Sequence, residues 1–196
     1  MPQKLWEADL QTKLKSNLYQ FEKFLEKKFN YKPEKNFKKL FNWTIKNSEQ
    51  FWSSMWEFSN IKGIKNDKFY FPKEIIKSKF LLKSKLNYAE NLLSKNDNTK
   101  AVTFISENGY REEKSWKELN INTLKLVNFF RENKIKKKDR IAAYTANQIE
   151  TVEGFIATSA IGAIWSSCSP DFGTQGVIER FSQIKPKLLI ITDRYY

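Results

Sequence analysis

The chain has 196 residues, 40% of them hydrophobic, and a formal net charge of +13. A chain of this length buries roughly 70% of the surface that its unfolded form exposes, so this hydrophobic content suffices for a folded core. The single cysteine, Cys168, excludes a disulfide framework and is expected to be a small core residue. The absence of histidine excludes histidine-based catalytic triads and histidine metal sites.

Residues 1–60 are expected to form a helical, aromatic-rich amino-terminal cap, and residues 1–10 lack the apolar core of a secretory signal. One amphipathic helix, ended by Pro33, is predicted from an apolar stripe at helical spacing that comprises Leu14, Leu18, Phe21 and Leu25. A second helix is expected to begin at Asn47 or Ser48. We interpret the four tryptophans of this cap as core or docking residues in preference to an aromatic ligand box: Trp6, Trp43, Trp52 and Trp56.

A lysine-rich connecting segment, residues 61–100, and an incomplete α/β subdomain, residues 101–196, are expected to follow. An Asn-Gly turn between the strands expected at residues 101–106 and 110–115 predicts a β-hairpin over residues 101–115. Ser115 is expected to cap the next helix, with Glu118 completing a capping box.

The densest basic cluster, residues 134–140, raises the question of a nucleic-acid partner. Arginine makes bidentate contacts with phosphate and guanine, yet only five of the 35 basic residues are arginine. The lysines are dispersed along the chain, and this cluster falls where a helix is expected to end, a position that favours cations. We therefore expect a solvated lysine-rich surface and no nucleic acid, with a basic polyanion-binding module as the alternative.

From Arg140 onward, short apolar strands alternate with helices, as is typical of a parallel sheet with helices on its faces. The expected strands are 141–145, 163–168 and 187–192, and the expected helices are 149–161 and 173 or 174 to 184. The sequence thus predicts the α/β class, with a helical amino-terminal cap followed by the start of a mostly parallel sheet with flanking helices. The longest nearly uncharged run, residues 154–171, is too short and too interrupted to span a bilayer, so we expect a soluble, cytoplasmic protein without a membrane partner.

The loop Ser169–Gly173 is the best candidate site. It follows a buried strand at the edge where open α/β sheets bind ligands, and it leads into a helix N-terminus, whose free N–H groups favour anions. Gly173 would let a ligand approach the backbone closely. A purely structural interpretation stays open, in which Asp171 or Thr174 caps the helix and Phe172 seals the sheet edge. The glycines form neither a dinucleotide-binding fingerprint nor a phosphate loop, so the chain carries no self-sufficient catalytic set.

Four segments carry a resemblance to a known family: FWSSMWEF at 51–58, LNYAENLL at 86–93, AIWSSCSPDFG at 163–173 and GVIERFSQIKPK at 176–187. In this order they resemble the amino-terminal part of the acetoacetyl-CoA synthetases, which belong to the acyl-adenylate-forming superfamily. The SSCSPDFG segment discriminates between families. Acetyl-CoA synthetases are similar in layout but typically carry a histidine and paired glycines there, which this chain lacks.

The resemblance implies the amino-terminal part of the large domain of an AMP-forming acetoacetate–CoA ligase, active in lipid and ketone-body metabolism. With Mg²⁺, ATP and acetoacetate would give an acyl-adenylate and pyrophosphate, and the thiol of coenzyme A would then displace AMP. The resemblance places Asp171, Phe172 and Gly173 at the entrance for coenzyme A and no catalytic residue in this chain. The family's nucleotide-binding and catalytic motifs lie beyond residue 196, so the chain is expected to be a fragment that is inactive alone.

The resemblance leaves the acid substrate open, and one turn differs from the family's usual sequence. Residues beyond this span build most of the carboxylate pocket in the family, so a ligase for another short acid such as acetate or propionate is the alternative.

The family usually has glycines around the Asp-Arg pair before the strand at Ile141. This chain has Lys134 and Lys138 there and retains Asp139 and Arg140. We interpret this as lysine drift in a turn that closes without glycine.

Overall fold

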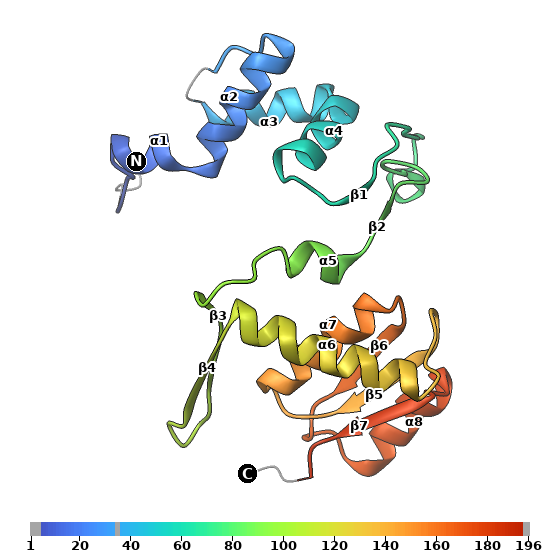
Figure 1. The fold of residues 1–196 in the computed structure, drawn as a ribbon. Helices are drawn as coiled ribbons and strands as arrows, with labels where there is room; N and C mark the ends of the chain where they lie inside the picture. Colours follow the sequence, from blue (N-terminus) through green and yellow to red (C-terminus); the bar gives the residue numbers. More distant parts are fainter. Residues whose placement is uncertain (1–4, 34–35, 194–196) are drawn as a thin grey trace. The chain divides into compact units, whose positions relative to one another are not determined.

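The computed structural model describes residues 5–33 and 36–193, and it contains two compact units, residues 1–85 and residues 86–196 (Figure 1). The first unit is mainly helical, and the second combines helices with strands. The boundary between the units falls within the connecting segment expected at residues 61–100. No helix in the described part of the chain is long and apolar enough to cross a membrane.

The described residues of the first unit form four α-helices, followed by short strands and a 3-10 turn. They are α1 (Leu10–Lys15), α2 (Asn17–Phe29), α3 (Phe37–Lys46), α4 (Ser48–Phe58), β1 (Gly63–Ile64), η1 (Ile75–Lys77) and β2 (Lys85–Leu86). Asp9, Ser16 and Asn36 begin the first three helices, because each side chain accepts a hydrogen bond from a backbone N–H group of the first turn. α4 begins at Ser48, as predicted.

The apolar stripe predicted as one amphipathic helix is divided between two helices. Ser16 adopts an extended conformation (φ −67°, ψ 145°), and its hydroxyl accepts a hydrogen bond from the first turn of α2. A serine that bonds the backbone in this way competes with the helical ladder, so Ser16 ends α1 and caps α2. Leu14 therefore lies in α1, and Leu18 is 48% exposed, whereas Phe21 and Leu25 are buried. The prediction of a single helix was wrong.

Aromatic side chains form much of the core of the first unit. The ring of Phe21 meets the rings of Phe51 and Phe58 edge-on, at centroid distances of 6.0 and 5.1 Å. Edge-to-face contacts are the favourable arrangement for aromatic pairs. Trp56 is buried and Trp43 packs against this cluster, as expected of core tryptophans. The other two tryptophans of the predicted cap are exposed: Trp6 and Trp52.

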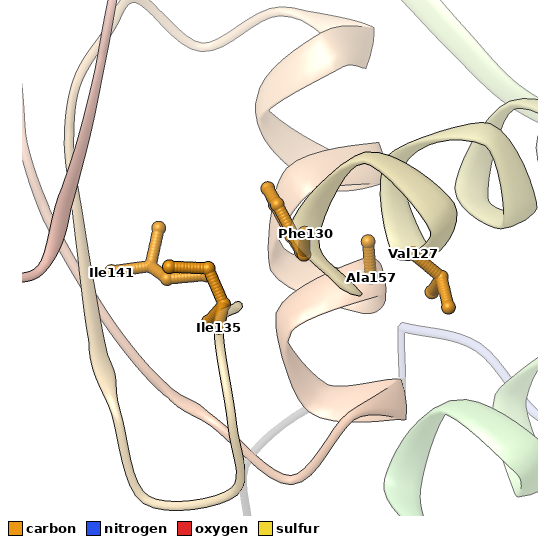
Figure 2. Packing of buried hydrophobic residues seen from close by; sticks show 5 residues of the cluster. All are labelled: Val127, Phe130, Ile135, Ile141 and Ala157. Carbon is orange, nitrogen blue, oxygen red and sulfur yellow. The ribbon is translucent and has the colours of Figure 1, made fainter. Parts of the chain in front are cut away.

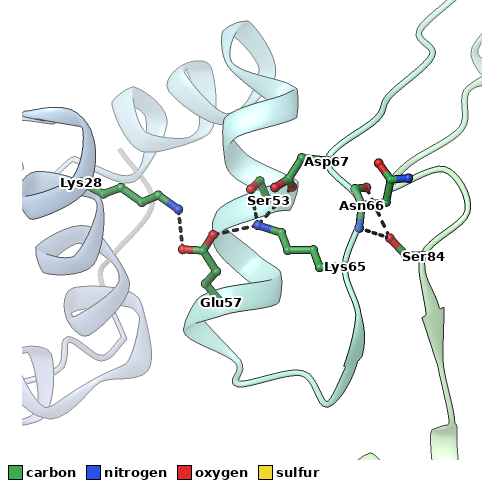
Figure 3. Close-up of polar contacts among 7 residues, drawn as sticks. All are labelled: Lys28, Ser53, Glu57, Lys65, Asn66, Asp67 and Ser84. Atoms are coloured by element: carbon green, nitrogen blue, oxygen red, sulfur yellow. Dashed lines mark hydrogen bonds and ion pairs between the residues drawn. The ribbon is translucent and has the colours of Figure 1, made fainter.

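An ion-pair network fastens the segment after α4 to α2 and α4 (Figure 3). Glu57 accepts a hydrogen bond from Lys28 of α2 and another, at 2.7 Å, from Lys65. Lys65 also donates to the hydroxyl of Ser53 at 2.6 Å and pairs with Asp67 at 3.1 Å. The hydrogen bonds from Lys28 and then Lys65 hold the pKa of Glu57 below its ordinary value.

The second unit has the predicted α/β architecture, which confirms the fold class. Its elements are α5 (Tyr88–Leu92), β3 (Lys100–Ile105), β4 (Arg111–Ser115), α6 (Trp116–Glu132), β5 (Arg140–Tyr144), α7 (Ile149–Ala160), β6 (Ile164–Cys168), α8 (Thr174–Ile184) and β7 (Leu188–Ile191). The strands β3 and β4 form the expected antiparallel hairpin. The other three strands form a parallel sheet in the order β6-β5-β7.

The central strand β5 is buried on both faces, and its residues 141–143 have no exposed surface. On one face, Ile141 packs in a cluster with Phe130 of α6 and residues of α7 (Figure 2). On the other face, Ala142 packs against Phe181 of α8. Helices therefore cover opposite faces of this strand, as a parallel sheet requires.

Asn87 fixes the LNYAENLL segment in the second unit. Its side-chain oxygen accepts a hydrogen bond from the N–H group of Glu90 at 3.2 Å and so caps α5. Its amide nitrogen donates to the carbonyl oxygens of Ser159 and Ala160, each at 3.1 Å. These carbonyls lie in the last turn of α7, where helical partners are incomplete, and that of Ser159 also accepts from the N–H group of Gly162 at 3.0 Å. Asn87 thus begins α5 and fastens it to the C-terminus of α7.

The predicted capping box at Ser115 is present at the start of α6, and the helix ends in a Schellman motif. The N–H group of Ile135 donates to the carbonyl of Phe130 at 2.9 Å, and that of Lys134 donates to the carbonyl of Arg131 at 2.9 Å. Phe130 and Ile135 also share the apolar cluster of Figure 2, which is the hydrophobic contact that accompanies this motif.

Lysines occupy left-handed backbone conformations in the turn that precedes β5. The φ angle is 57° at Lys134 and 71° at Lys138. An L-residue in this region costs roughly 1–2 kcal/mol, because its β-carbon crowds the carbonyl oxygen, whereas glycine is free of this cost. The turn closes without glycine, as expected, and it does so in a conformation that favours glycine.

Replacing Lys134 with glycine is expected to raise the free energy of unfolding by about 0.5–1 kcal/mol, because the strain relieved exceeds the extra entropy of glycine in the unfolded chain. Urea unfolding of wild type and variant measures the difference. The control is Lys136→Gly, at a position where φ is not positive, which should destabilise the chain by a similar amount. A destabilised Lys134→Gly chain would contradict the strain argument.

Glu57→Gln is expected to destabilise the chain at pH 7 by roughly 0.5–1 kcal/mol, a small effect because solvent screens exposed ion pairs. The folded-state pKa of Glu57 is lowered, so its stabilisation is present above the unfolded-state pKa and is lost as the pH falls through the folded-state value. Urea unfolding at pH 7 and well below pH 4 should show the difference disappearing in acid. Glu107→Gln, in the exposed turn of the hairpin, is the control and should change little.

Candidate functional site

The connections that leave the carboxyl ends of β5 and β6 lead to helices on opposite faces of the parallel sheet. The helix after β5 is α7, which packs on the face that carries Ile141, and the helix after β6 is α8, which packs on the face that carries Ala142. The chain leaves these two neighbouring strands toward opposite faces of the sheet and then crosses to the far side of β5. Open α/β sheets bind ligands outside the carboxyl ends of their strands, which is the edge of the sheet where these connections begin.

The loop Ser169–Gly173 directly follows β6 at this edge of the sheet, and it contains the three consecutive residues predicted to bind a cofactor. The N–H group of Phe172 donates to the carbonyl of Ser169 at 3.1 Å, which closes a tight turn. The hydroxyl of Ser169 donates to the carboxylate of Asp171 at 2.6 Å. Asp171 and Phe172 are both exposed. The turn therefore presents a carboxylate and an aromatic ring to solvent.

Tyr144, the last residue of β5, contacts this loop at the carboxyl edge of the sheet. Its hydroxyl lies 2.9 Å from the carbonyl oxygen of Pro170 and 2.9 Å from that of Phe172, and it donates its proton to this pair of acceptors. Tyr144 is paired with Cys168 in the parallel register, so its side chain starts beside the last residue of β6, from which the loop leaves. Tyr144 was not among the residues predicted from the sequence. The signal that could have identified it is a tyrosine at the end of the neighbouring strand.

Phe172 and Arg180 form a cation–π pair beside the loop. The guanidinium carbon of Arg180 lies 4.4 Å from the centroid of the Phe172 ring, which is 38% exposed. The ring folds back over α8, since a β-carbon at Gly176 would lie 3.7 Å from it. Arg180 forms no ion pair with a carboxylate of the described residues. Its N–H groups are therefore available to an anionic ligand.

Gly173 occupies the N-cap position of α8, so Thr174 is the first residue of the helix and not its cap. The φ angle of Gly173 is −59°, which any residue can adopt, so the backbone conformation does not require glycine. A β-carbon at this position would meet no atom within 4 Å. The glycine therefore leaves the N-terminus of α8 open on this side, where N–H groups and the helix dipole favour an anion.

Polar side chains continue along the carboxyl edge of the sheet. The hydroxyl of Thr151 donates to that of Thr145 at 3.1 Å, and the amide of Gln148 donates to the hydroxyl of Thr192 at 3.4 Å. A cavity of about 270 Å³ lies between β3 and the start of α7, with Gln148 in its lining. Residues 5–33 and 36–193 contain no group of three or more acidic, cysteine or histidine side chains that could hold a metal ion. The described groups suit an anionic or aromatic ligand.

Comparison with known sequences gives a family model and several relatives. Residues 90–195 match the family model described as AMP-binding enzyme. The chain is 38% identical to the acetoacetyl-coenzyme A synthetase of Rhizobium meliloti (strain 1021) over 156 residues, and 39% identical to the acetoacetyl-CoA synthetase of Xenopus tropicalis over 164. Each match covers 79% of this chain and 24% of the relative. The malonamoyl-CoA synthetase of Penicillium aethiopicum is 30% identical over 188 residues, which are 89% of this chain and 25% of that protein.

Solved structures give the same relationship. The acetoacetyl-CoA synthetase from Streptomyces lividans matches 99% of this chain with a TM-score of 0.87 and 26% identity, and the match covers 31% of that protein. An acyl-CoA synthetase of Brucella canis matches 54% of the chain with a TM-score of 0.51 and 21% identity, which is a likeness of fold alone. The chain spans about a quarter of the length of the curated relatives that it matches.

Proposed function

The chain belongs to the AMP-binding enzyme family, and on this basis we propose that it acts as the amino-terminal part of an AMP-forming acetoacetate–CoA ligase. The observation that carries the proposal is the match of 99% of the chain to the acetoacetyl-CoA synthetase from Streptomyces lividans. The identities of 38% and 39% to two further acetoacetyl-CoA synthetases support it. We further propose a cytoplasmic location and a place in lipid and ketone-body metabolism for the whole protein.

The proposed reaction has two steps. The carboxylate of acetoacetate reacts with ATP to give the acyl-adenylate and pyrophosphate, and the thiol of coenzyme A then attacks the acyl carbon with release of AMP. Mg²⁺ would neutralise charge on the phosphates of ATP. The described residues contain no acidic cluster that could hold the ion, so we propose no Mg²⁺ ligand among them.

We assign Asp171, Phe172 and Gly173 to the entrance for coenzyme A, a ligand with an adenine ring, phosphates and an amide-containing arm. The N-terminus of α8 at Gly173 favours phosphate. The paired Phe172 ring and Arg180 guanidinium offer an aromatic face and a positive charge. The carboxylate of Asp171 can accept a hydrogen bond from an amide N–H group of the ligand. These features support a binding role for the loop.

The second candidate function is a ligase for another short acid, and one relative supports a particular kind of acid. The malonamoyl-CoA synthetase of Penicillium aethiopicum matches 89% of the chain at 30% identity. Its name and that of the acetoacetyl-CoA synthetases denote short acyl groups with a second carbonyl at the same position. Acetate and propionate lack that carbonyl. The relatives therefore favour an acid with a carbonyl at carbon 3 over a simple short-chain acid.

Pyrophosphate release by the full-length gene product, with acetoacetate, malonamate, acetate and propionate as substrates, tests the acid. We expect kcat/KM to be highest for acetoacetate and at least about tenfold lower for acetate and propionate, because a site that hydrogen-bonds the second carbonyl rejects acids without it. Higher activity with malonamate would assign the second candidate. Acetate turnover above that of acetoacetate would overturn the substrate assignment.

Arg180→Gln and Phe172→Leu are each expected to raise the KM for coenzyme A of the full-length gene product by roughly five- to tenfold, because each removes one half of an exposed cation–π pair proposed to meet the ligand. The KM values for ATP and acetoacetate should stay unchanged. The control is Arg131→Gln, which removes the same positive charge from the exposed end of α6. This residue is far from the loop along the sequence. Equal effects on all three KM values would argue against a specific role in binding coenzyme A.

A further inference from the structure

Tyr144 joins the most deeply buried strand of the second unit to the loop proposed to meet coenzyme A. Its ring packs against the cluster of Ala142, Cys168 and Phe181. Its backbone is paired on both sides, with Cys168 of β6 and with Ile191 of β7. The phenol therefore extends from a point that the sheet and α8 hold in place. A hydroxyl fixed in this way can set the position of a loop that it contacts.

Two carbonyl groups of the loop converge on this hydroxyl, those of Pro170 and Phe172, each at 2.9 Å. They belong to the peptide groups that lead into Asp171 and Gly173. Both peptides are trans, and in a planar trans peptide the N–H group points opposite to the carbonyl. The N–H groups of Asp171 and Gly173 therefore point away from the phenol. The orientation of Gly173 N–H, beside the N-terminus of α8, is thus tied to Tyr144.

We propose that Tyr144 is a positioning residue for the binding of coenzyme A. Its hydroxyl sets the peptide planes of the loop so that the N–H group of Gly173 and the N-terminus of α8 face the ligand, which the phenol itself does not touch. The inference rests on the proposed function, because it assumes that the ligand of this loop is coenzyme A. It adds a residue of the neighbouring strand to a site otherwise made of the loop and α8.

Removing the hydroxyl of Tyr144 tests its positioning role separately from the packing of its ring. Tyr144→Phe keeps the ring, so the cluster with Ala142 and Phe181 remains filled. The carbonyls of Pro170 and Phe172 lose their shared donor and turn toward water. A hydrogen bond of this kind shifts the balance between the held and the released loop by roughly five- to tenfold.

Amide hydrogen exchange in the 196-residue chain tests the hold on the loop. We expect the amides of Asp171 and Phe172, which donate hydrogen bonds to Ser169, to exchange roughly fivefold faster in Tyr144→Phe than in wild type. Tyr110→Phe removes a hydroxyl from a tyrosine that is 56% exposed beside the hairpin, and it should leave these rates unchanged. Unchanged rates in Tyr144→Phe would overturn the inference, and this measurement does not depend on the identity of the ligand.

Steady-state kinetics of the full-length gene product test the consequence for binding. In Tyr144→Phe we expect the KM for coenzyme A to rise roughly fivefold, while the KM values for ATP and acetoacetate and the melting temperature stay close to those of wild type. A general structural defect would instead lower the melting temperature and raise all three KM values, and that result would overturn a positioning role. If the wild-type protein forms no thioester, the proposed function fails, and with it the assignment of coenzyme A. The exchange measurement would still decide whether Tyr144 holds the loop.

Discussion

The burial of β5 on both faces is the constraint on which the second unit depends. Residues 141–143 have no exposed surface, so each face of the strand needs its own covering helix. The face of Ile141 is covered by α6 and α7, and that of Ala142 by α8. Because α7 follows β5 and α8 follows β6, covering both faces forces the chain to leave the two strands in opposite directions. The opposite directions of these two connections are therefore a consequence of packing, and the candidate site lies on the connection from β6 to α8.

The alternation of side chains along β5 connects this burial to the loop. Successive side chains of a strand point to opposite faces, so Tyr144 shares the face of Ala142, which is the face that α8 covers. The loop Ser169–Gly173 leads into α8 and therefore passes within reach of the phenol. A register shift of one residue would turn the side chains of Tyr144 and Ala142 away from α8 and toward α7. The same register thus fills the core and places the hydroxyl.

The elements of the second unit were predictable from the sequence because local signals agree with the tertiary fold. The capping box at Ser115 and the alternation after Arg140 depend on residues near one another in the chain. In the first unit, the serine hydroxyl of Ser16 outweighed the apolar periodicity and divided the predicted helix. Tyr144 and Arg180 were missed, because their contacts with the loop depend on strand register and on how Phe172 folds back over α8. The assignment of the loop to coenzyme A came from resemblance alone.

The lysine-rich composition is accommodated at exposed positions, even where the backbone conformation favours glycine. Lys134 and Lys138 adopt left-handed conformations in exposed positions, and each carries a conformational cost of roughly 1–2 kcal/mol. The hydrogen bonds of the Schellman motif and the contact between Ile135 and Phe130 hold the turn despite that cost. The buried residues 141–143 of β5 contain no charged side chain, because an unpaired charge there would cost far more than strain in a turn. A surface can therefore gain lysines while the strand that carries Tyr144 keeps its packing.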